Sequence, residues 1–576
     1  MCGIIGLVSE TEFSVKDSLI SGLKRLEYRG YDSWGFASPE GELFRVTGEI
    51  TLPKKDIFTN TGIAHTRWAT NGTVTVDNAH PHFNNDKSIF VVHNGIIENA
   101  HELRQKLKKK GCEFVSETDT EIIPHYFDQK LKKGFSMKVA MFDFLNDVKG
   151  TFAILLIKKN ENRIYAIKRD SPLVLGVCNG KNVLSSDVYA FSDVTNKAVF
   201  FEDNEFAVIE SDNYEFYDSF GKNIQKEIKK FEWEEEEQTK EDFDHYMLKE
   251  INEESNVARR LLQSLETQQY DNFNKFTDIL YNSSRVVFVS CGTSYHAALI
   301  GSYILNKAGI RSQAVIASEF DNFVDIDKKT TVIAISQSGE TMDVVVVVKK
   351  AAKKGAKILS IVNVPYSTVQ RYSNVSLEIM AGQEICVAAT KSFTNQLITL
   401  FALGKELGYD TIKLKNIPAK ITKTITKTQS KVKKLANELK EREHIFVLGR
   451  GVSYPIAREF ALKLKEIPYI HAEGMMGGEL KHGTIALVEK GTPVICLIPN
   501  DNSDMITNTK EVEARGARTI IISNTKDGEI NLEKSDDAEF SIYSCIVGHL
   551  LSYYIAKKKG LPIDKPRNLA KSVTVK

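Results

Sequence analysis

The sequence predicts a multidomain protein of the α/β and α+β classes. Three observations support this prediction. At 576 residues the chain is too long for a single hydrophobic core, and about 150 residues per domain suggests three or four units. The first half is rich in strands, such as residues 150–157 and 172–176. The second half alternates apolar strands with helices at short spacing and repeats itself, which is typical of doubly wound parallel sheets.

The composition describes an ordinary soluble globular protein. Charged residues make up 26% of the chain and apolar residues 42%, with a formal net charge of +1, so nothing favours binding to nucleic acid or to an anionic membrane. The longest apolar runs fall far short of the ~20 residues that span a bilayer. The seven cysteines are scattered without metal-ligand spacing, which predicts reduced thiols in the cytoplasm and no metal site.

The first motif along the chain is Met1-Cys2-Gly3. A small residue after the initiator allows Met1 to be removed, which makes Cys2 the N-terminus. A free α-amine has a pKa of about 7.7–8.0, so it can accept the proton of the thiol on the same residue. Residues 4–8 are apolar and β-prone, which predicts that Cys2 lies at the mouth of a buried strand. Met-Cys-Gly also begins proteins without such chemistry, so the motif alone is a weak signal.

Three polar segments follow with chemistry that suits an amino-acid substrate. Arg67 suits bidentate capture of a carboxylate, although a surface salt bridge is an equal alternative. Asn94 and Gly95 can together face a developing oxyanion, although Asn-Gly is also a common hairpin turn. Asp119 stands at the start of an expected helix, where it could pair with a substrate ammonium or simply cap the helix.

Five motifs together resemble an N-terminal-nucleophile glutamine amidotransferase domain: Cys2-Gly3-Ile4, Arg29-Gly30-Tyr31-Asp32, His65-Thr66-Arg67-Trp68-Ala69-Thr70, His93-Asn94-Gly95 and Glu117-Thr118-Asp119. The resemblance implies an αββα sandwich in which Cys2 attacks the side-chain amide of glutamine. It also implies an oxyanion site at Asn94 and Gly95.

The same resemblance implies roles for six further residues. Arg67 and Asp119 would hold the amino-acid end of glutamine, Trp68 would gate an ammonia path, and the surroundings of the glutamine pocket would be formed by Thr70, His80 and Arg29. The chain departs from the family pattern at Asn71 and at Trp34, which are expected to affect affinity or packing but not to remove a reacting group.

The second half of the chain is an internal duplication. Gly451 follows Gly292 by 159 positions, Val494 follows Val332 by 162, and Gly516 follows Gly355 by 161, so the offset holds from residue 292 to residue 355 of the first copy. Each copy is expected to form a doubly wound parallel sheet with ligands at the carboxyl ends of its strands.

Hydroxyl-rich turns follow two strands of the first copy, at residues 291–294 and 336–341. Hydroxyls and backbone N–H groups at a helix N-terminus form a phosphate cradle, whereas one such cluster alone is more often a helix cap. The corresponding stretch of the second copy, Pro499-Asn500-Asp501-Asn502, is acidic and would repel phosphate. One phosphate site per chain is therefore predicted.

The second copy instead carries charged residues at helical spacing. Glu459, Lys463 and Glu466 share one helix face, which usually indicates a surface ion pair. His482 stands in a glycine-flanked turn, where a histidine can titrate near neutrality. The tail around Lys571 has no amphipathic pattern and, taken alone, is typical of a mobile end.

Residues 280–576 resemble the tandem sugar-isomerase domains of the glutamine–fructose-6-phosphate aminotransferase (isomerizing) family, and with the first half the likeness covers nearly the whole chain. It implies that Lys571 forms a Schiff base with the open sugar, that His482 assists ring opening, and that Glu466 moves a proton from C1 to C2. A lysine beside a partly shielded carboxylate can adjust the pKa of that carboxylate for such a proton transfer. Lys463 is the expected lysine, and Glu459 on the same helix face is included in the predicted catalytic group. The implied sugar-phosphate ligands are Thr293, Ser294, Ser336, Gln337, Ser338, Thr341 and Val387.

The chain departs from this family at residues 474–477 and around Thr390-Lys391, where Ala389 and Ser392 stand. These differences are expected to alter loop shape rather than the reaction.

The predicted organisation has five parts: a glutamine amidotransferase domain (2–225), a charged linker (226–244), a first (245–415) and a second (416–562) sugar-isomerase domain, and a catalytic tail (563–576). The predicted reaction converts glutamine and fructose 6-phosphate into glutamate and glucosamine 6-phosphate with internal ammonia transfer and no cofactor. A homodimer is implied by the likeness alone.

Three rival functions make different demands on the sequence: a sugar-phosphate-sensing regulator that has lost its catalytic residues, another glutamine-dependent amidotransferase, and a deglycase without a working glutaminase. The first predicts loss of Cys2, Glu466 or Lys571, and all three are present. The second needs a nucleotide or pyrophosphate site, and no Walker motif occurs. The third has no use for Arg67, Asn94 and Asp119 together.

Overall fold

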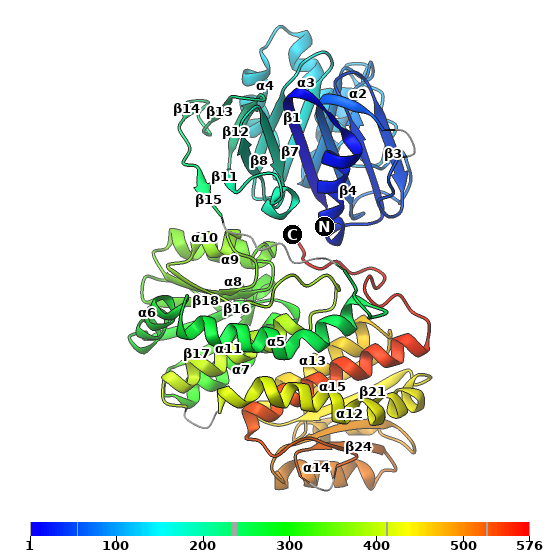
Figure 1. The fold of residues 1–576 in the computed structure, drawn as a ribbon, viewed down its shortest axis with the longest axis vertical. Helices are drawn as coiled ribbons and strands as arrows, with labels where there is room; N and C mark the ends of the chain where they lie inside the picture. Colours follow the sequence, from blue (N-terminus) through cyan, green and yellow to red (C-terminus); the bar gives the residue numbers. More distant parts are fainter. Residues whose placement is uncertain (1, 54–55, 232–238, 410–412, 526–527, 575–576) are drawn as a thin grey trace. The chain divides into compact units, whose positions relative to one another are not determined.

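A computed structural model of the chain describes residues 2–53, 56–231, 239–409, 413–525 and 528–574 (Figure 1). The chain divides into two compact units, one formed by Met1–Glu235 with Ala570–Lys576 and the other by Glu236–Leu569. No helix in these described ranges combines the length and the apolar character needed to cross a membrane.

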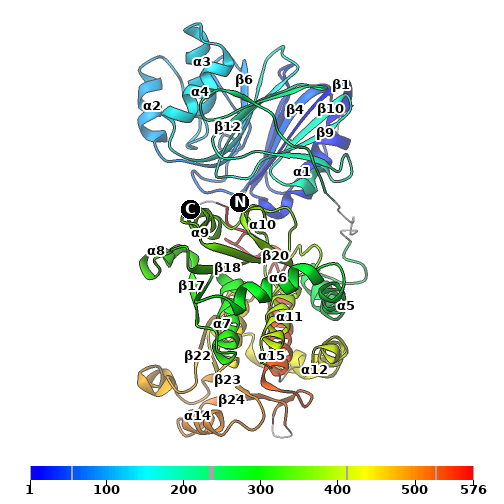
Figure 2. The same cartoon turned by 90° about the vertical axis from the view of Figure 1, so that its left-hand side faces the viewer.

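The described part of the first unit holds two antiparallel sheets, which Figure 2 shows as separate layers. The eight-stranded sheet contains, in spatial order, β15 (Lys229–Lys230), β11 (Lys197–Phe200), β9 (Val174–Cys178), β10 (Lys181–Ser185), β1 (Gly3–Ser14), β4 (Phe58–Arg67), β2 (Ser33–Ala37) and β3 (Leu43–Thr47). The seven-stranded sheet contains β14 (Asn223–Ile224), β13 (Tyr214–Tyr217), β12 (Glu205–Ile209), β8 (Ile164–Arg169), β7 (Gly150–Lys158), β6 (Ile89–Ile97) and β5 (His82–Phe83).

Alternation along the strands of the seven-stranded sheet builds two cores. In β6, Phe90 and Val92 point into the core between the sheets, while Ile89 and Val91 point to the outer face. Three helices cover that outer face: α2 (Ala100–Lys108), α3 (Ile122–Lys132) and α4 (Met137–Asp147). On the other side, a π-helical turn over Val15–Ile20 and α1 (Ser21–Arg25) pack against β1 and β4. The predicted αββα sandwich is confirmed.

The second unit contains two parallel five-stranded sheets with the same topology. In sequence order within each copy, the strands lie 2-1-3-4-5 across the sheet, which is a doubly wound order. The first sheet contains β17 (Ser312–Ile316), β16 (Arg285–Ser290), β18 (Thr330–Ser336), β19 (Lys357–Val362) and β20 (Val375–Glu378). The second contains β22 (His471–Met476), β21 (His444–Gly449), β23 (Pro493–Ile498), β24 (Arg518–Ser523) and β25 (Ile530–Asn531).

Backbone angles support the duplication residue by residue. Gly292 and Gly451 both have φ of +54°, and each lies just after the first strand of its copy. A left-handed residue at this position favours glycine, so the repeat preserves a local conformation as well as a topology.

One hydrophobic core joins the two copies. The core cluster takes residues from both sheets and from the helices between them, and both views show α11 and α15 lying between the sheets (Figures 1 and 2). The helix α15 is buried on every side from Ala538 to Ala556, as expected of a helix without a polar face. The helices of the unit are α5 (Tyr246–Glu266), α6 (Tyr270–Tyr281), α7 (Gly292–Lys307), α8 (Phe320–Phe323), α9 (Met342–Lys353), α10 (Thr368–Tyr372), α11 (Lys391–Glu406), α12 (Ile417–Leu439), α13 (Ser453–Glu466), α14 (Ser503–Glu513) and α15 (Asp537–Lys558).

Two segments differ from simple expectations. Lys229–Lys230 lies inside the predicted linker but pairs with β11, and the acidic residues 234–237 lie outside the described residues.

The carboxyl-terminal segment is anchored rather than mobile where it enters the tail. Both carboxylate oxygens of Asp564 accept N–H groups from the first turn of α5, each at 3.0 Å, and the N–H of Arg567 donates to the hydroxyl of Tyr469 at 2.8 Å. The interpretation of a mobile end is wrong for these residues.

Candidate functional site

Cys2 lies directly before β1, as predicted, and its thiol contacts the segment that follows β4. The N–H of Trp68 donates to Sγ at 3.2 Å, and the thiol donates to the carbonyl of Trp68 at 3.5 Å. Burial raises the pKa of this thiol above its usual value, against the lowering effects of nearby N–H and cationic groups. A thiol of this kind needs a local base to form a thiolate near neutral pH, which a freed α-amine would supply.

Asn94 and Gly95 lie within β6 and not in a turn, so the hairpin alternative is wrong. The strand continues past them to Ile97, and they pair with Ala153 and Phe152 of β7. The side-chain amide of Asn94 donates to the carbonyl of Cys2 at 2.9 Å, which brings a donor to the nucleophile. Gly95 has φ of +131°, and a Cβ there would lie 2.0 Å from the carbonyl oxygen of Thr151. Only glycine fits.

Arg67 is the last residue of β4 and not part of the loop that the sequence suggested. It is buried, and it makes no ion pair with a described residue, so a surface salt bridge is also wrong. Its guanidinium donates to the carbonyls of Asn71, Gly72 and Thr73, at 2.6 Å for Asn71. Burial lowers its pKa, and the negative charges around it, including Asp119, oppose this effect. Arg67 therefore organises residues 71–73 while lying close to acidic groups.

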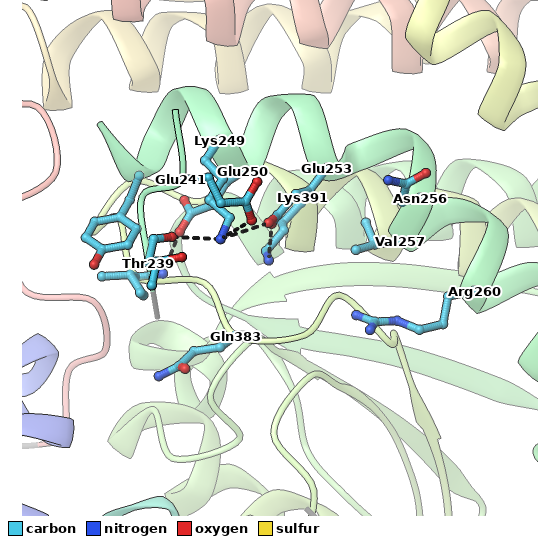
Figure 3. A pocket seen from close by; sticks show the side chains of 12 residues that line it. Thr239, Glu241, Lys249, Glu250, Glu253, Asn256, Val257, Arg260, Gln383 and Lys391 are labelled. Carbon is cyan, nitrogen blue, oxygen red and sulfur yellow. Dashed lines mark hydrogen bonds and ion pairs between the residues drawn. The ribbon is translucent and has the colours of Figure 1, made fainter. Parts of the chain in front are cut away.

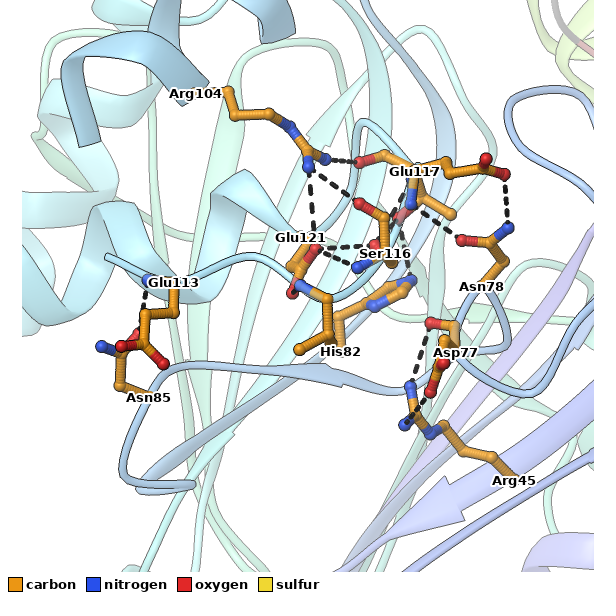
Figure 4. A network of polar contacts seen from close by, with 12 residues as sticks. Arg45, Asp77, Asn78, His82, Asn85, Arg104, Glu113, Ser116, Glu117 and Glu121 are labelled. Atoms are coloured by element: carbon orange, nitrogen blue, oxygen red, sulfur yellow. Dashed lines mark hydrogen bonds and ion pairs between the residues drawn. The ribbon is translucent and has the colours of Figure 1, made fainter. Parts of the chain in front are cut away.

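A second set of contacts fixes the same loop to the segment that carries Asp119 (Figure 4). The Glu117 carboxylate accepts the N–H of Thr73 and the side-chain amide of Asn78, each at 2.9 Å. These hydrogen bonds lower the pKa of Glu117. Asp119 is half-buried and accepts the N–H of Ile97 at 2.7 Å, so it ties the end of β6 and does not cap α3. The structure thus adds Glu117 and Asn78, to which the sequence analysis gave no role.

The other predicted glutamine-pocket residues lie in different surroundings. Arg29 is buried and paired with Asp187 at 2.6 Å. Thr70 is exposed, and Trp68 is half-buried with its ring edge-on to Tyr31 at 5.5 Å. Of the two departures, Asn71 is exposed and offers its carbonyl to Arg67, whereas Trp34 is fully buried.

His80 belongs to a group of four buried histidines, with His65, His82 and His93. The rings of His65 and His80 stack at 3.9 Å, and the hydroxyls of Thr118 and Thr120 bind His82 and His93 at 3.0 and 2.9 Å. Burial lowers the pKa of all four imidazoles, and for three of them the value falls well below its usual range. The group is therefore neutral at physiological pH.

In the second unit, the two predicted phosphate loops lie at neighbouring strand ends, since β16 pairs with β18. The hydroxyl of Ser336 accepts the N–H of Gly339 at 3.0 Å, and that of Ser338 accepts the N–H of Glu340 at 3.2 Å. Thr341 stands at the N-cap of α9, but its side chain makes no capping hydrogen bond. A helix cap is therefore the wrong interpretation of Thr341. Gln337 is half-buried between these hydroxyls.

The hydroxyls in the turn after β16 form hydrogen bonds with side chains and not with the N–H groups of their own loop. Ser294 accepts the side-chain amide of Gln396 at 3.0 Å. The hydroxyl of Thr293 donates to Glu459 at 3.0 Å and accepts from Lys463 at 3.2 Å. Thr293 thus links the first copy to the charged residues of the second.

Glu459, Lys463 and Glu466 form a chain of buried charges, so the interpretation as a surface ion pair is wrong. Nζ of Lys463 lies 3.2 Å from Glu459 and 2.6 Å from Glu466, and the exposed fractions of the three side chains are 0%, 0% and 20%. Burial would raise the pKa of Glu459, but Lys463 and a hydrogen bond from His296 outweigh it and lower the pKa to about 2. Burial would lower the pKa of Lys463, yet the two carboxylates raise it.

The remaining predicted site residues of the second half are the catalytic residues His482 and Lys571 and the sugar-phosphate ligand Val387. His482 is exposed in a short 3-10 turn over Leu480–His482. Val387 is half-buried and donates its N–H to the carbonyl of Asp564 at 3.0 Å. Lys571 is half-buried in the segment that groups with the first unit.

A cavity of about 480 Å³ in the second unit contains none of the predicted sugar-phosphate residues. Figure 3 shows Lys249 and Lys391 directed towards Glu253, at 3.6 and 2.7 Å. The charged side chains that line this cavity form ion pairs with one another, which include Lys249 with Glu241 and Lys391 with Glu253.

Comparison with known proteins places both halves. A glutamine amidotransferase domain model matches residues 65–193, and a SIS domain model matches residues 279–405 and 438–542. The glutamine–fructose-6-phosphate aminotransferase (isomerizing) of Sulfolobus acidocaldarius is 40% identical over 591 aligned positions, covering 100% of both chains. The chain belongs to the glutamine–fructose-6-phosphate aminotransferase (isomerizing) family.

Other members of this family agree. The Clostridium acetobutylicum aminotransferase is 39% identical and also covers 100% of both chains. Among solved structures, the C-terminal domain of glucosamine-fructose-6-phosphate aminotransferase from Francisella tularensis matches 57% of this chain and 100% of its own, with 35% identity and a TM-score of 0.52. The family assignment therefore rests on the full length and not on one domain.

The neutral histidines predict that mild acid destabilises the first unit. Their pKa values are lower in the folded chain than the reference value of about 6.5, so stability is present above pH 6.5 and is lost as pH falls below it. We expect a loss of up to about 1.4 kcal/mol per histidine between pH 7.5 and 5.5. Denaturant unfolding followed by tryptophan fluorescence measures this, because all three tryptophans precede residue 240.

The control for this prediction is His82→Asn, which removes one titrating ring and should reduce the difference between the two pH values. An unfolding midpoint that is the same at pH 7.5 and 5.5 contradicts the interpretation of the group as neutral.

Proposed function

We propose that this chain converts glutamine and fructose 6-phosphate into glutamate and glucosamine 6-phosphate. The observation that carries the proposal is the match to aminotransferases of this name over 100% of both chains, so that it spans Cys2 and Lys571 of this chain. We further propose the five-part domain organisation given above and a cytoplasmic location. The seven described cysteines form no disulfide with one another, which supports this location.

In the proposed glutaminase step, Cys2 attacks the amide carbon of glutamine after Met1 is removed. The α-amine accepts the thiol proton, and the side-chain amide of Asn94 with the N–H of Gly95 stabilises the tetrahedral oxyanion. The contact between Asn94 and the Cys2 carbonyl supports this role. Arg67 and Asp119 bind the α-carboxylate and α-ammonium of glutamine. The tetrahedral intermediate expels ammonia and leaves a thioester on Cys2, and water then hydrolyses this thioester to release glutamate.

In the proposed isomerase step, ammonia reaches the sugar internally and the hydroxyls of residues 336–341 hold the phosphate group. Lys571 forms a Schiff base with C2 of the open sugar and releases water. Ammonia then displaces the lysine from C2, and the resulting imine acidifies the C1 proton. Glu466 then moves that proton to C2. The hydrogen bond from Lys463 to Oε2 of Glu466 supports this role, because it orients the carboxylate while leaving it one-fifth exposed.

We propose that the protein acts as a homodimer in which His482 serves the sugar site of the partner subunit. The exposure of His482 supports this proposal, as does the exposure of two nearby apolar side chains, Met476 (50%) and Leu487 (66%). Apolar side chains exposed beside a predicted catalytic histidine favour a subunit interface.

Cys2→Ala tests the division of labour. With glutamine as the donor, we expect the rate of glucosamine 6-phosphate formation to fall at least about a thousandfold, because the nucleophile is lost. With ammonium as the donor, the rate should stay close to that of the wild type. Glutamine-dependent product formation in this variant, or failure of ammonium to support it, contradicts the proposal and favours one of the rival functions.

Subunit complementation tests the dimer. Lys571→Ala and His482→Ala chains should each be nearly inactive alone. If His482 serves the partner's site, co-expression of the two variants restores about a quarter of wild-type activity, because half of the dimers are mixed and each carries one complete site. No recovery in purified mixed dimers shows that His482 acts within its own chain or not at all.

A further inference from the structure

His296 is a buried histidine on α7 to which the sequence analysis gave no role. Its Nδ1 lies 2.7 Å from Oε2 of Glu459, and the exposed fractions of the two side chains are 7% and 0%. It comes from the first copy of the duplicated half, whereas Glu459 comes from α13 of the second copy. The contact is therefore a polar connection between the two copies at the buried charges.

The two oxygens of Glu459 have different donors. Oε1 accepts a hydrogen bond from Thr293 at 3.0 Å and forms an ion pair with Lys463 at 3.2 Å, whereas Oε2 accepts from His296. A carboxylate only accepts, so Nδ1 of His296 carries the proton in this contact. With both oxygens bound, the carboxylate cannot rotate without losing a donor.

The fixed carboxylate in turn fixes Lys463. Its Nζ contacts Glu459, Thr293 and Glu466 at 3.2, 3.2 and 2.6 Å. If Glu459 rotates, the first of these contacts lengthens, and the ammonium shifts relative to Oε2 of Glu466. The orientation of Glu466 therefore depends on a donor that is three contacts away, His296.

We propose that His296 is a positioning residue for the isomerase reaction, which holds Glu466 through Glu459 and Lys463. The inference rests on the proposed function for its kinetic consequence but not for its geometry. His296 is not placed against the sugar or the reacting atoms. It acts on the rate of proton transfer and not on sugar binding.

Two substitutions of His296 by an amide side chain separate the effect of the donor's position from the effect of losing the imidazole ring. In His296→Asn, the amide Nδ2 stands close to the place of Nδ1, so the donor to Glu459 is kept. In His296→Gln, the amide is one carbon further out and close to the place of Nε2, so the donor is displaced. His471→Gln is the matched control, because His471 is an exposed histidine that lines the same cavity as His296.

Steady-state kinetics with ammonium as the nitrogen donor test this proposal. In His296→Gln, kcat should fall about ten- to a hundredfold, as for loss of a hydrogen bond to a charged group, while KM for fructose 6-phosphate changes less than about twofold. His296→Asn should recover most of the wild-type kcat, and His471→Gln should match the wild type. Equal kcat for the Asn and Gln variants, or a change in KM alone, overturns the proposal.

A crystal structure of His296→Gln provides a readout that does not depend on activity. We expect the Glu459 carboxylate to rotate and Nζ of Lys463 to move out of hydrogen-bond distance of Oε2 of Glu466. An unchanged chain of contacts overturns the proposal. If the wild type makes no glucosamine 6-phosphate, the proposed function fails, and this structure alone decides the positioning role.

Discussion

The second unit depends on a carboxylate and an ammonium group that are both fully buried. Glu459 and Lys463 have no exposed surface, and an unpaired charge in such a place costs several kcal/mol. The pair is tolerated because Thr293, His296 and Glu466 supply the remaining hydrogen bonds. Two of these partners belong to the other copy. The two sheets must therefore dock in one arrangement before the charges are satisfied, and the shared apolar core around α15 provides that docking.

In the first unit, the candidate site is supported by neutral polar groups. The site is assembled at the start of β1, the end of β4 and within β6. Pairing of β1 with β4 sets the positions of Cys2 and Arg67 in one sheet, and pairing of β6 with β7 sets that of Asn94 in the other. The polar residues behind it are four histidines held uncharged by burial, which avoids repulsion with Arg67. Contacts from Arg67 and Glu117 then fix residues 71–78 beside the nucleophile. Backbone geometry and hydrogen bonds therefore fix this site, and an ion pair between Arg45 and Asp77 at 3.8 Å adds to them within residues 71–78.

The sequence allowed most of the architecture to be predicted because periodicity is a local signal. The alternating strands and the offset near 160 residues anticipated two parallel sheets of one topology, and the shared φ of Gly292 and Gly451 agrees. The burial of Glu459 and Lys463 could not be predicted, since helical spacing shows that residues share a face but not what covers that face. His296 could not be found for the same reason, because its partner lies 163 residues away. Asn94-Gly95 suggested a hairpin, and pairing with β7 overrode that turn preference.

A double-mutant cycle on Glu459 and Lys463 tests the central claim most directly, with unfolding of the full chain followed by far-ultraviolet circular dichroism. If the pair is buried and mutually compensating, Glu459→Leu and Lys463→Met each lower the free energy of unfolding by about 3–5 kcal/mol. The double variant then loses far less than the sum of the two, because it leaves neither fully buried charge unpaired. Glu466 loses its contact with Lys463 in both variants that carry Lys463→Met. Losses that add within about 0.5 kcal/mol contradict the account, since they show that the two side chains do not depend on each other.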